Sequence, residues 1–204
     1  ERYLNTEALS KLLEPPSHSQ KPIDYLVSNI KDKSSLPLHR IAIAEDKAFH
    51  FRYPETKEFL ESLKIETIPW SPLNDEIIPK NINGIILPGG FPEKYAEQLS
   101  SSKRSLSSLR SCYGNKPIYA ECGGMILLGE TLVDEKNNSH KMASLLPFKA
   151  RRSSLQVGYR NLFCTKDTLI ANKNDVLIGH EFHRWELIRN PVRSEEFDGI
   201  LNTS

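Results

Sequence analysis

The sequence predicts an α/β fold in which a parallel sheet carries helices on both faces. Between residues 39 and 128, short apolar runs alternate with longer polar or amphipathic segments, and this alternation is typical of strand–helix–strand units. One apolar run, residues 118–120, stops at Glu121-Cys122 and is followed by two glycines and a second apolar run. A strand, a tight turn bearing a nucleophile and a helix form a nucleophile elbow.

The elements follow from the apolar runs and from the residues that interrupt them. A helical region at 94–113 is expected to break near 100–103, and the turn residues after it favour a hairpin. We expect strands at 40–44, 66–70, 84–87, 118–120, 155–160, 161–164 and 176–183, a hairpin at 131–133 and 141–143, and helices at 54–63, 94–113 and after Cys122. In parallel sheets, ligands sit beyond the carboxyl ends of strands, so Gly89-Gly90 and Cys122 are expected to face one crevice.

The composition fits one ordinary domain with a modest appendage. The chain has 204 residues, 38% of them hydrophobic and 26% charged, and its net charge of +1 favours neither nucleic acid nor a membrane surface as partner. Three widely spaced cysteines do not suggest a disulfide framework, so we expect a cytoplasmic setting. Residues 1–36 are expected to be a linker with an apolar stripe at 23–30 that docks on another surface, and residues 37–204 the main domain.

Cys122 is the candidate nucleophile, because a helix start is expected to lower the pKa of its thiol. The competing interpretation is a small buried hydrophobic residue, which is how we interpret Cys112 and Cys164. A thiolate nucleophile needs a base, and His180 and His183 are the candidates. Strand alternation puts them on opposite faces, so only one can face Cys122; a capping or surface role is the alternative.

The glycines near these positions predict an oxyanion hole. The backbone amides of Gly89-Gly90 and Gly123 are unobstructed by side chains and are placed to bind developing negative charge. A plain β-turn before Pro92 is the alternative for the glycine pair. Glu121 is either a substrate contact or a structural cap. His39, His50 and His140 have no partners at metal-ligand spacing, so no metal site is expected, and no phosphate-binding loop is present in the sequence.

Three motifs in this order carry a family resemblance. They are LPGGFPE at 87–93, YAECGG at 119–124 and GHEFH at 179–183. Together they resemble the class I-like glutamine amidotransferase domain of cobyrinic acid a,c-diamide synthase, over residues 40–185. The resemblance implies a class I glutamine amidotransferase-like fold and a glutaminase that supplies ammonia in cobalamin biosynthesis.

The resemblance also implies the residue roles. Cys122 attacks the carboxamide of glutamine, His183 raises its nucleophilicity, and the amides of Gly90 and Gly123 form the oxyanion hole, with Glu121 at the substrate. The chain departs from the ordinary pattern at Trp185, where class I enzymes carry the third triad member, Glu; another carboxylate such as Glu186 is a possible substitute.

The full family enzyme has an ATP- and magnesium-dependent synthetase domain before the glutaminase. It phosphorylates the a and c carboxylates of cobyrinic acid, and ammonia then displaces phosphate. We therefore expect no cofactor in this chain, glutamine and that domain as its partners, and residues 1–36 as the end of the missing domain. Two alternatives stay open: a glutaminase serving another acid-amide ligase, such as the peptidoglycan-amidating type, and an idle docking domain of the same fold.

Overall fold

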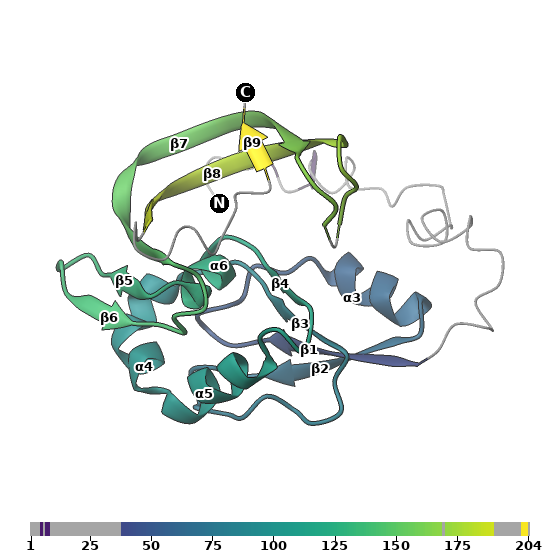
Figure 1. Cartoon of the computed structure of the whole chain (residues 1–204), viewed down its shortest axis with the longest axis horizontal. Helices are drawn as coiled ribbons and strands as arrows, with labels where there is room; N and C mark the ends of the chain where they lie inside the picture. Colours follow the sequence, from purple (N-terminus) through teal and green to yellow (C-terminus); the bar gives the residue numbers. More distant parts are fainter. Residues whose placement is uncertain (1–4, 6, 9–37, 169, 190–200, 204) are drawn as a thin grey trace.

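The computed structural model describes residues 5, 7–8, 38–168, 170–189 and 201–203. The expectations for residues 1–36 lie almost entirely outside this part of the chain. The described residues form a four-stranded parallel sheet with helices packed on it, and a second sheet of five strands (Figure 1). The predicted α/β class is confirmed. Among these residues, no helix has the length and apolar character needed to span a membrane.

The parallel sheet has the strand order β2-β1-β3-β4. Each strand lies within one residue of a predicted apolar run, because these runs are short, rich in β-branched residues and bounded by turn residues. The strands are β1 (His39–Ala44), β2 (Ile65–Trp70), β3 (Gly84–Leu87) and β4 (Ile118–Ala120).

The helices also follow the prediction. The expected break in the helical region lies at Ser102, whose backbone leaves the helical conformation (φ −77°, ψ 67°). The helical elements are α3 (Pro54–Ser62), the 3₁₀ helix η1 (Pro92–Tyr95), α4 (Ala96–Ser101), α5 (Lys103–Cys112) and α6 (Gly123–Leu128).

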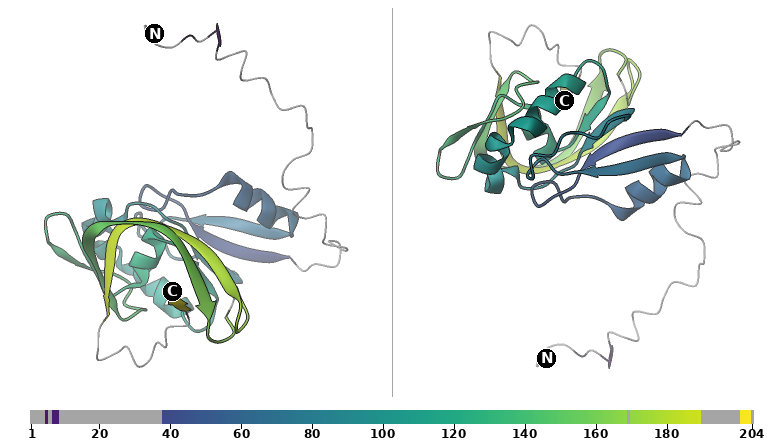
Figure 2. Two further views of the ribbon diagram at one scale, coloured as in Figure 1. Left: turned by 90° about the horizontal axis from the view of Figure 1, so that it is seen from above. Right: turned by 90° about the horizontal axis from the view of Figure 1, so that it is seen from below.

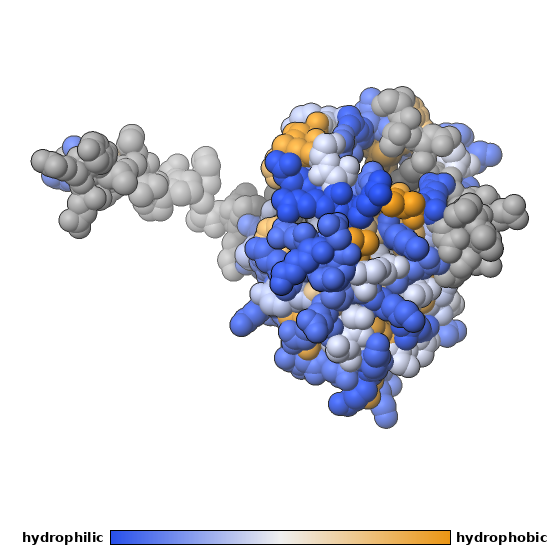
Figure 3. Space-filling view, turned by 90° about the vertical axis from the view of Figure 1, so that its left-hand side faces the viewer, coloured by the Kyte–Doolittle hydropathy of each residue, from blue (hydrophilic) through white to orange (hydrophobic). Residues whose placement is uncertain are grey.

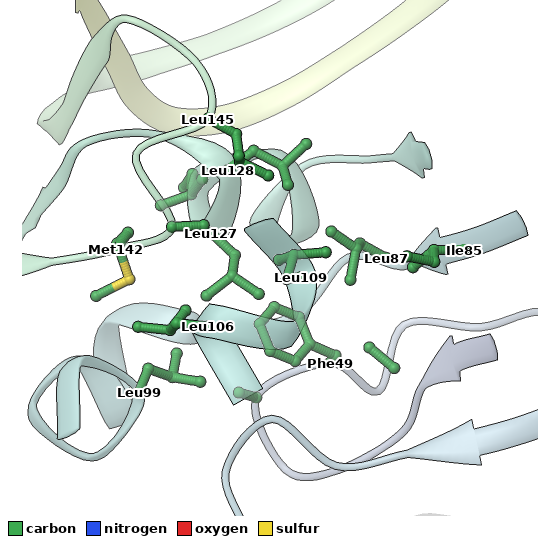
Figure 4. Packing of buried hydrophobic residues seen from close by; sticks show 14 of the residues in the cluster. Phe49, Ile85, Leu87, Leu99, Leu106, Leu109, Leu127, Leu128, Met142 and Leu145 are labelled. Carbon is green, nitrogen blue, oxygen red and sulfur yellow. The ribbon is translucent and has the colours of Figure 1, made fainter. Parts of the chain in front are cut away.

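The two faces of the parallel sheet are covered unequally. Helices α4, α5 and α6 bury their leucines against one face, together with Phe49 and Met142 (Figure 4). Leu99, Leu109 and Leu127 in this cluster are fully buried. Helix α3 lies on the other face and has no buried residue. The core therefore lies almost wholly on the side of α6, the helix that follows Cys122.

The second sheet contains a long curved ribbon made by β7 and β8, which arches beside the parallel sheet (Figures 1 and 2). Its strands are β5 (Thr131–Val133), β6 (Ser139–Lys141), β7 (Phe148–Cys164), β8 (Val176–Arg189) and β9 (Leu201–Thr203). The ribbon is anchored at Phe148, which is buried and accepts a 2.8 Å hydrogen bond from the backbone N–H of Glu130.

Three expectations about this sheet need correction. Residues 155–160 and 161–164 belong to one strand that begins at Phe148, and β8 does not end at His183 but continues to Arg189. The cause is the first part of β7, which the sequence did not indicate as a strand. It gives the end of β8 a partner, with Arg151 opposite Glu186 and Arg152 opposite Trp185. The predicted hairpin exists, but its second strand begins at Ser139.

Candidate functional site

Cys122 lies at a sharp turn between β4 and α6, as the elbow pattern predicts. Its backbone has φ 46° and ψ −114°, a conformation that residues other than glycine rarely adopt. Two hydrogen bonds hold the turn: the N–H of Glu121 donates to the Leu87 carbonyl (3.0 Å), and the N–H of Gly124 donates to the Glu121 carbonyl (2.8 Å). Strained backbone of this kind persists where the surrounding structure fixes it, and it is concentrated at functional sites.

The glycines after Cys122 are required by close packing. A Cβ atom on Gly123 would lie 2.8 Å from Cδ of Pro92, and one on Gly124 would lie 2.1 Å from the carbonyl oxygen of Leu87. No side chain fits at these distances. The pair therefore lets α6 begin directly against β3 and η1, which fixes the position of the thiol.

Two backbone amides point at the sulfur atom of Cys122. The N–H groups of Gly123 and Gly90 donate hydrogen bonds to it and thereby favour its thiolate. Gly90 is held in place by residue 48, because a Cβ on Gly90 would lie 2.0 Å from the carbonyl oxygen of Ala48. The two amides that sequence reasoning assigned to an oxyanion hole thus converge on the candidate nucleophile. Their catalytic role stays a prediction.

The pKa of the Cys122 thiol is raised overall, although the amide of Gly123 at the start of α6 lowers it, as the sequence led us to expect. Burial by the surrounding protein is the largest cause, although the residue is open to solvent on one side. The amides of Gly123 and Gly90 oppose this effect, whereas the carboxylates of Glu93 and Glu121 add to it. Helix α6 has only six residues, so its dipole is too short to outweigh burial and two nearby negative charges.

Glu121 faces a cavity beside the elbow. The hydroxyl of Tyr119 donates a short hydrogen bond to its carboxylate, which is the main reason that the pKa of Tyr119 is raised to about 12. Both residues line a cavity of about 490 Å³ on the α3 face of the parallel sheet. Its floor is one row of residues across the four strands: Pro69, Ile43, Ile86 and Tyr119.

The two candidate bases lie on β8, in the second sheet. His180 is on the exposed face and packs edge-on against Tyr159, with ring centroids 5.2 Å apart. His183 is on the opposite, half-buried face. No hydrogen bond joins Cys122 to either histidine in the part of the chain that the structure describes. The pairing of Cys122 with His183 therefore stays a prediction.

The carboxylate beside His183 is Glu181, which sequence reasoning did not single out. Its Oε2 lies 3.7 Å from Nε2 of His183, and the N–H of Trp185 lies 3.4 Å from the Nδ1 atom. Glu186, the proposed substitute for the third triad member, instead forms an ion pair with Arg151. Strand alternation was the available signal, because residues 181 and 183 share a face.

Glu93 is the second residue that sequence reasoning missed. It lies in η1, one residue after the proline that packs on Gly123, and its carboxylate raises the pKa of the Cys122 thiol. The signal was its place in the LPGGFPE motif. The remaining cysteines fit structural roles: Cys164 is buried, and burial raises the pKa of Cys112.

Comparison with known proteins places this geometry in context. Residues 40–199 match the model of the CobB/CobQ-like glutamine amidotransferase domain. The structure of PurLQS from Thermotoga maritima contains a similar chain, with a TM-score of 0.58 and 15% identity, covering 82% of this chain and 75% of that one. At this identity the likeness concerns the fold alone.

Several curated relatives carry closely related names. The cobyrinate a,c-diamide synthases of Synechococcus sp. and Saccharolobus solfataricus are 35% and 36% identical, over 85% and 98% of this chain. The hydrogenobyrinate a,c-diamide synthase of Agrobacterium fabrum is 35% identical over 86% of it. The chain spans 39%, 44% and 40% of these relatives, respectively. The matches confirm the resemblance carried by the three motifs and the fold that it implied.

Proposed function

Because the chain belongs to the CobB/CobQ-like glutamine amidotransferase family, we propose that it is the glutaminase half of a cobyrinate a,c-diamide synthase. The observation that carries the proposal is the convergence of the Gly90 and Gly123 amides on the sulfur of Cys122, at a strained elbow. Relatives named for cobyrinate and for hydrogenobyrinate are equally similar. The acceptor is therefore one of these two acids.

The proposed reaction forms and breaks one thioester. The Cys122 sulfur attacks the carboxamide carbon of glutamine, its proton passes to His183, and the amides of Gly90 and Gly123 bind the oxyanion. Collapse of the intermediate breaks the C–N bond, and His183 returns the proton to the nitrogen, which leaves as ammonia. Water then hydrolyses the thioester and releases glutamate. Glu181 would orient the His183 ring in place of the missing third triad member.

The remaining part of the enzyme would carry the acid-activating chemistry. The relatives extend well beyond the length that this chain spans, and we propose that their additional part binds ATP and magnesium and phosphorylates the a and c carboxylates. The raised thiol pKa, and the lack of a hydrogen bond between His183 and Cys122 among the described residues, support slow glutamine hydrolysis by the chain alone. Docking of the ATP-dependent half would bring them together, as conformational closure does in other enzymes.

Two measurements test this function. A glutamine-analogue electrophile, diazo-oxonorleucine, should label the chain once, at Cys122, and a Cys122→Ser variant should stay unlabelled. Glutamate release should be slow for the chain alone and rise when the ATP-dependent half, ATP and cobyrinic acid are added. Labelling at Cys112 or Cys164 would overturn the assignment of the nucleophile. Equal rates with and without the second half would overturn the coupling.

A further inference from the structure

Asp46 accepts hydrogen bonds from donors on two loops that follow neighbouring strands. Its Oδ1 atom accepts the backbone N–H of Ala48 at 2.8 Å. Its Oδ2 atom accepts the hydroxyl of Ser71 at 3.0 Å and the backbone N–H of Leu73 at 2.9 Å. Hydrogen bonds to a carboxylate are stronger than those between neutral groups. The side chain therefore joins the loop after β1 to the loop after β2, and it fixes the first loop two residues further along the chain.

The loop that Asp46 holds, residues 45–51, lies at the carboxyl end of the parallel sheet. Strand β1 points toward the side of the molecule that carries α4, β5 and β6 (Figure 1), where hydrophilic side chains dominate the surface (Figure 3). Asp46 is partly buried, and Ala48 and Phe49 are fully buried. The loop is therefore fixed by internal contacts, although it lies near a hydrophilic surface.

This loop contacts the Gly89-Gly90 peptide in two places. The backbone N–H of Phe51 donates to the carbonyl of Gly89 at 3.1 Å. The Ala48 carbonyl is packed against Gly90, where a Cβ atom would lie 2.0 Å from its oxygen. The peptide is trans, so its C=O and N–H point in opposite directions. The hydrogen bond from Phe51 therefore turns the N–H of Gly90 away from the loop.

The elbow lies where this N–H points. A Cβ atom on Gly123 would lie 3.2 Å from the nitrogen of Gly90, and one on Gly89 would lie 3.5 Å from Cβ of Cys122. These distances agree with the hydrogen bond that the Gly90 amide donates to the sulfur. The donor that an oxyanion needs is thus beside the nucleophile, and contacts from residues 45–51 set its orientation.

We propose that Asp46 is a positioning residue for the oxyanion amide, because it holds the loop that orients the Gly89-Gly90 peptide beside Cys122. The inference rests on the proposed glutaminase function and adds to it a residue that acts through other residues. An oxyanion forms only when the sulfur attacks the carboxamide, so the N–H of Gly90 stabilises the transition state more than it stabilises bound glutamine. A displaced peptide should therefore slow the reaction without weakening substrate binding.

Asp46→Asn tests this role, because it keeps the size of the side chain and replaces one acceptor oxygen with a donor. At least one backbone N–H then faces another donor. Glutamate release is measured with the ATP-dependent half, ATP and cobyrinic acid present. We expect kcat to fall about tenfold, because complete loss of one oxyanion donor costs about 10²- to 10³-fold and a displaced donor keeps part of its effect. KM should change by less than about twofold, since ground-state binding is retained.

The matched control is Asp75→Asn. Asp75 also accepts a backbone N–H, from Ser105 at 2.9 Å, but it holds the first turn of α5 instead of residues 45–51. Its substitution should leave kcat unchanged. Circular dichroism shows whether each variant folds. If Asp46→Asn does not fold, Ser71→Ala takes its place: it removes one of the hydrogen bonds to the Asp46 carboxylate and should lower kcat by a smaller factor.

The same assay separates failure of this inference from failure of the proposed function. An unchanged kcat in folded Asp46→Asn, or in Ser71→Ala where that variant replaces it, overturns the inference. An equal fall of kcat in Asp75→Asn, or a rise of KM at constant kcat in Asp46→Asn, overturns it as well. Glutamate release that persists in Cys122→Ser would instead overturn the proposed function.

Discussion

Gly124 lies so close to Leu87 that α6 and β3 meet backbone to backbone. A Cβ atom on Gly124 would be 2.1 Å from the carbonyl oxygen of Leu87 and 2.6 Å from its carbonyl carbon. The same carbonyl accepts the N–H of Glu121. The turn that bears Cys122 therefore depends on an approach that only glycine permits.

The first prediction concerns this contact. Gly124→Ala must displace α6 from β3, and we expect a loss of stability of about 1–3 kcal/mol, as for other overpacked sites. Thermal unfolding followed by circular dichroism measures it. Gly179→Ala is the control, because a Cβ there would lie 3.7 Å from Leu162, an ordinary contact. Equal melting temperatures for the two variants would contradict the prediction.

The second prediction concerns the ionisation of Cys122. Because burial and two carboxylates raise the pKa of this thiol, its thiolate fraction at neutral pH is smaller than that of an ordinary cysteine. The rate of alkylation by iodoacetamide should therefore keep rising with pH beyond the usual thiol pKa of 9.0. Glu93→Gln should lower the pH at which this rate reaches half of its maximum, because it removes one of the carboxylates that raise the thiol pKa. If the rate instead reaches half of its maximum at a lower pH than for a free cysteine peptide, the amides of Gly90 and Gly123 lower the thiol pKa by more than burial raises it.

The third prediction separates the two histidines. With the ATP-dependent half present, His183→Ala should reduce glutamate release by about 10²- to 10⁴-fold, because it removes the general base. His180→Ala should have a small effect, because its ring packs on Tyr159 at the exposed face of the ribbon. The assignment is reversed if His180→Ala proves the more damaging change.

The fourth prediction concerns the β5–β6 turn. Asp134 accepts hydrogen bonds from the His140 ring (2.8 Å) and from the backbone N–H groups of Asn138 and Lys136, and the pKa of its carboxyl is lowered from 3.8 to about 2. A lowered pKa means that its contribution to stability is present above the unfolded pKa and is lost as pH falls toward the folded one.

The measurement compares thermal unfolding of the wild type with Asp134→Asn across pH. The wild type should be the more stable at neutral pH, and the difference should shrink as pH falls from 3.8 to about 2. Glu135→Gln is the control, because Glu135 is exposed and forms only a surface ion pair with Arg152. A difference in stability between the two proteins that stays constant down to a pH of about 2 would contradict the lowered pKa of Asp134.

Sequence patterns were sufficient for the parallel sheet and insufficient for the second one. Strands such as β3 are short apolar runs between turn residues, so their bounds can be predicted from local composition. The first part of β7 is rich in charged and small residues without a regular alternation, and it is a strand because β8 pairs with it. Pairing over such a distance in sequence leaves no local signal. For that reason the strand bearing His183 was expected to end too early.

The candidate site also has features that the sequence predicted and one that it did not. The motif around Cys122 predicted the elbow and the glycine amides, because both depend on residues adjacent in sequence. The raised pKa of the thiol was missed, since it results from burial and from Glu93, which is 29 positions away in the chain. Contacts of this kind depend on how η1 packs against α6.

The anchoring of the ribbon at Phe148 has a mechanical consequence. His183 pairs with Gln156, eight residues along β7 from that anchor, which is up to about 26 Å at about 3.3 Å per residue. Over such a lever arm, a tilt of about 5° at Phe148 would move the imidazole by about 2 Å. A partner that presses on the ribbon could thus adjust the distance between imidazole and sulfur without touching either group.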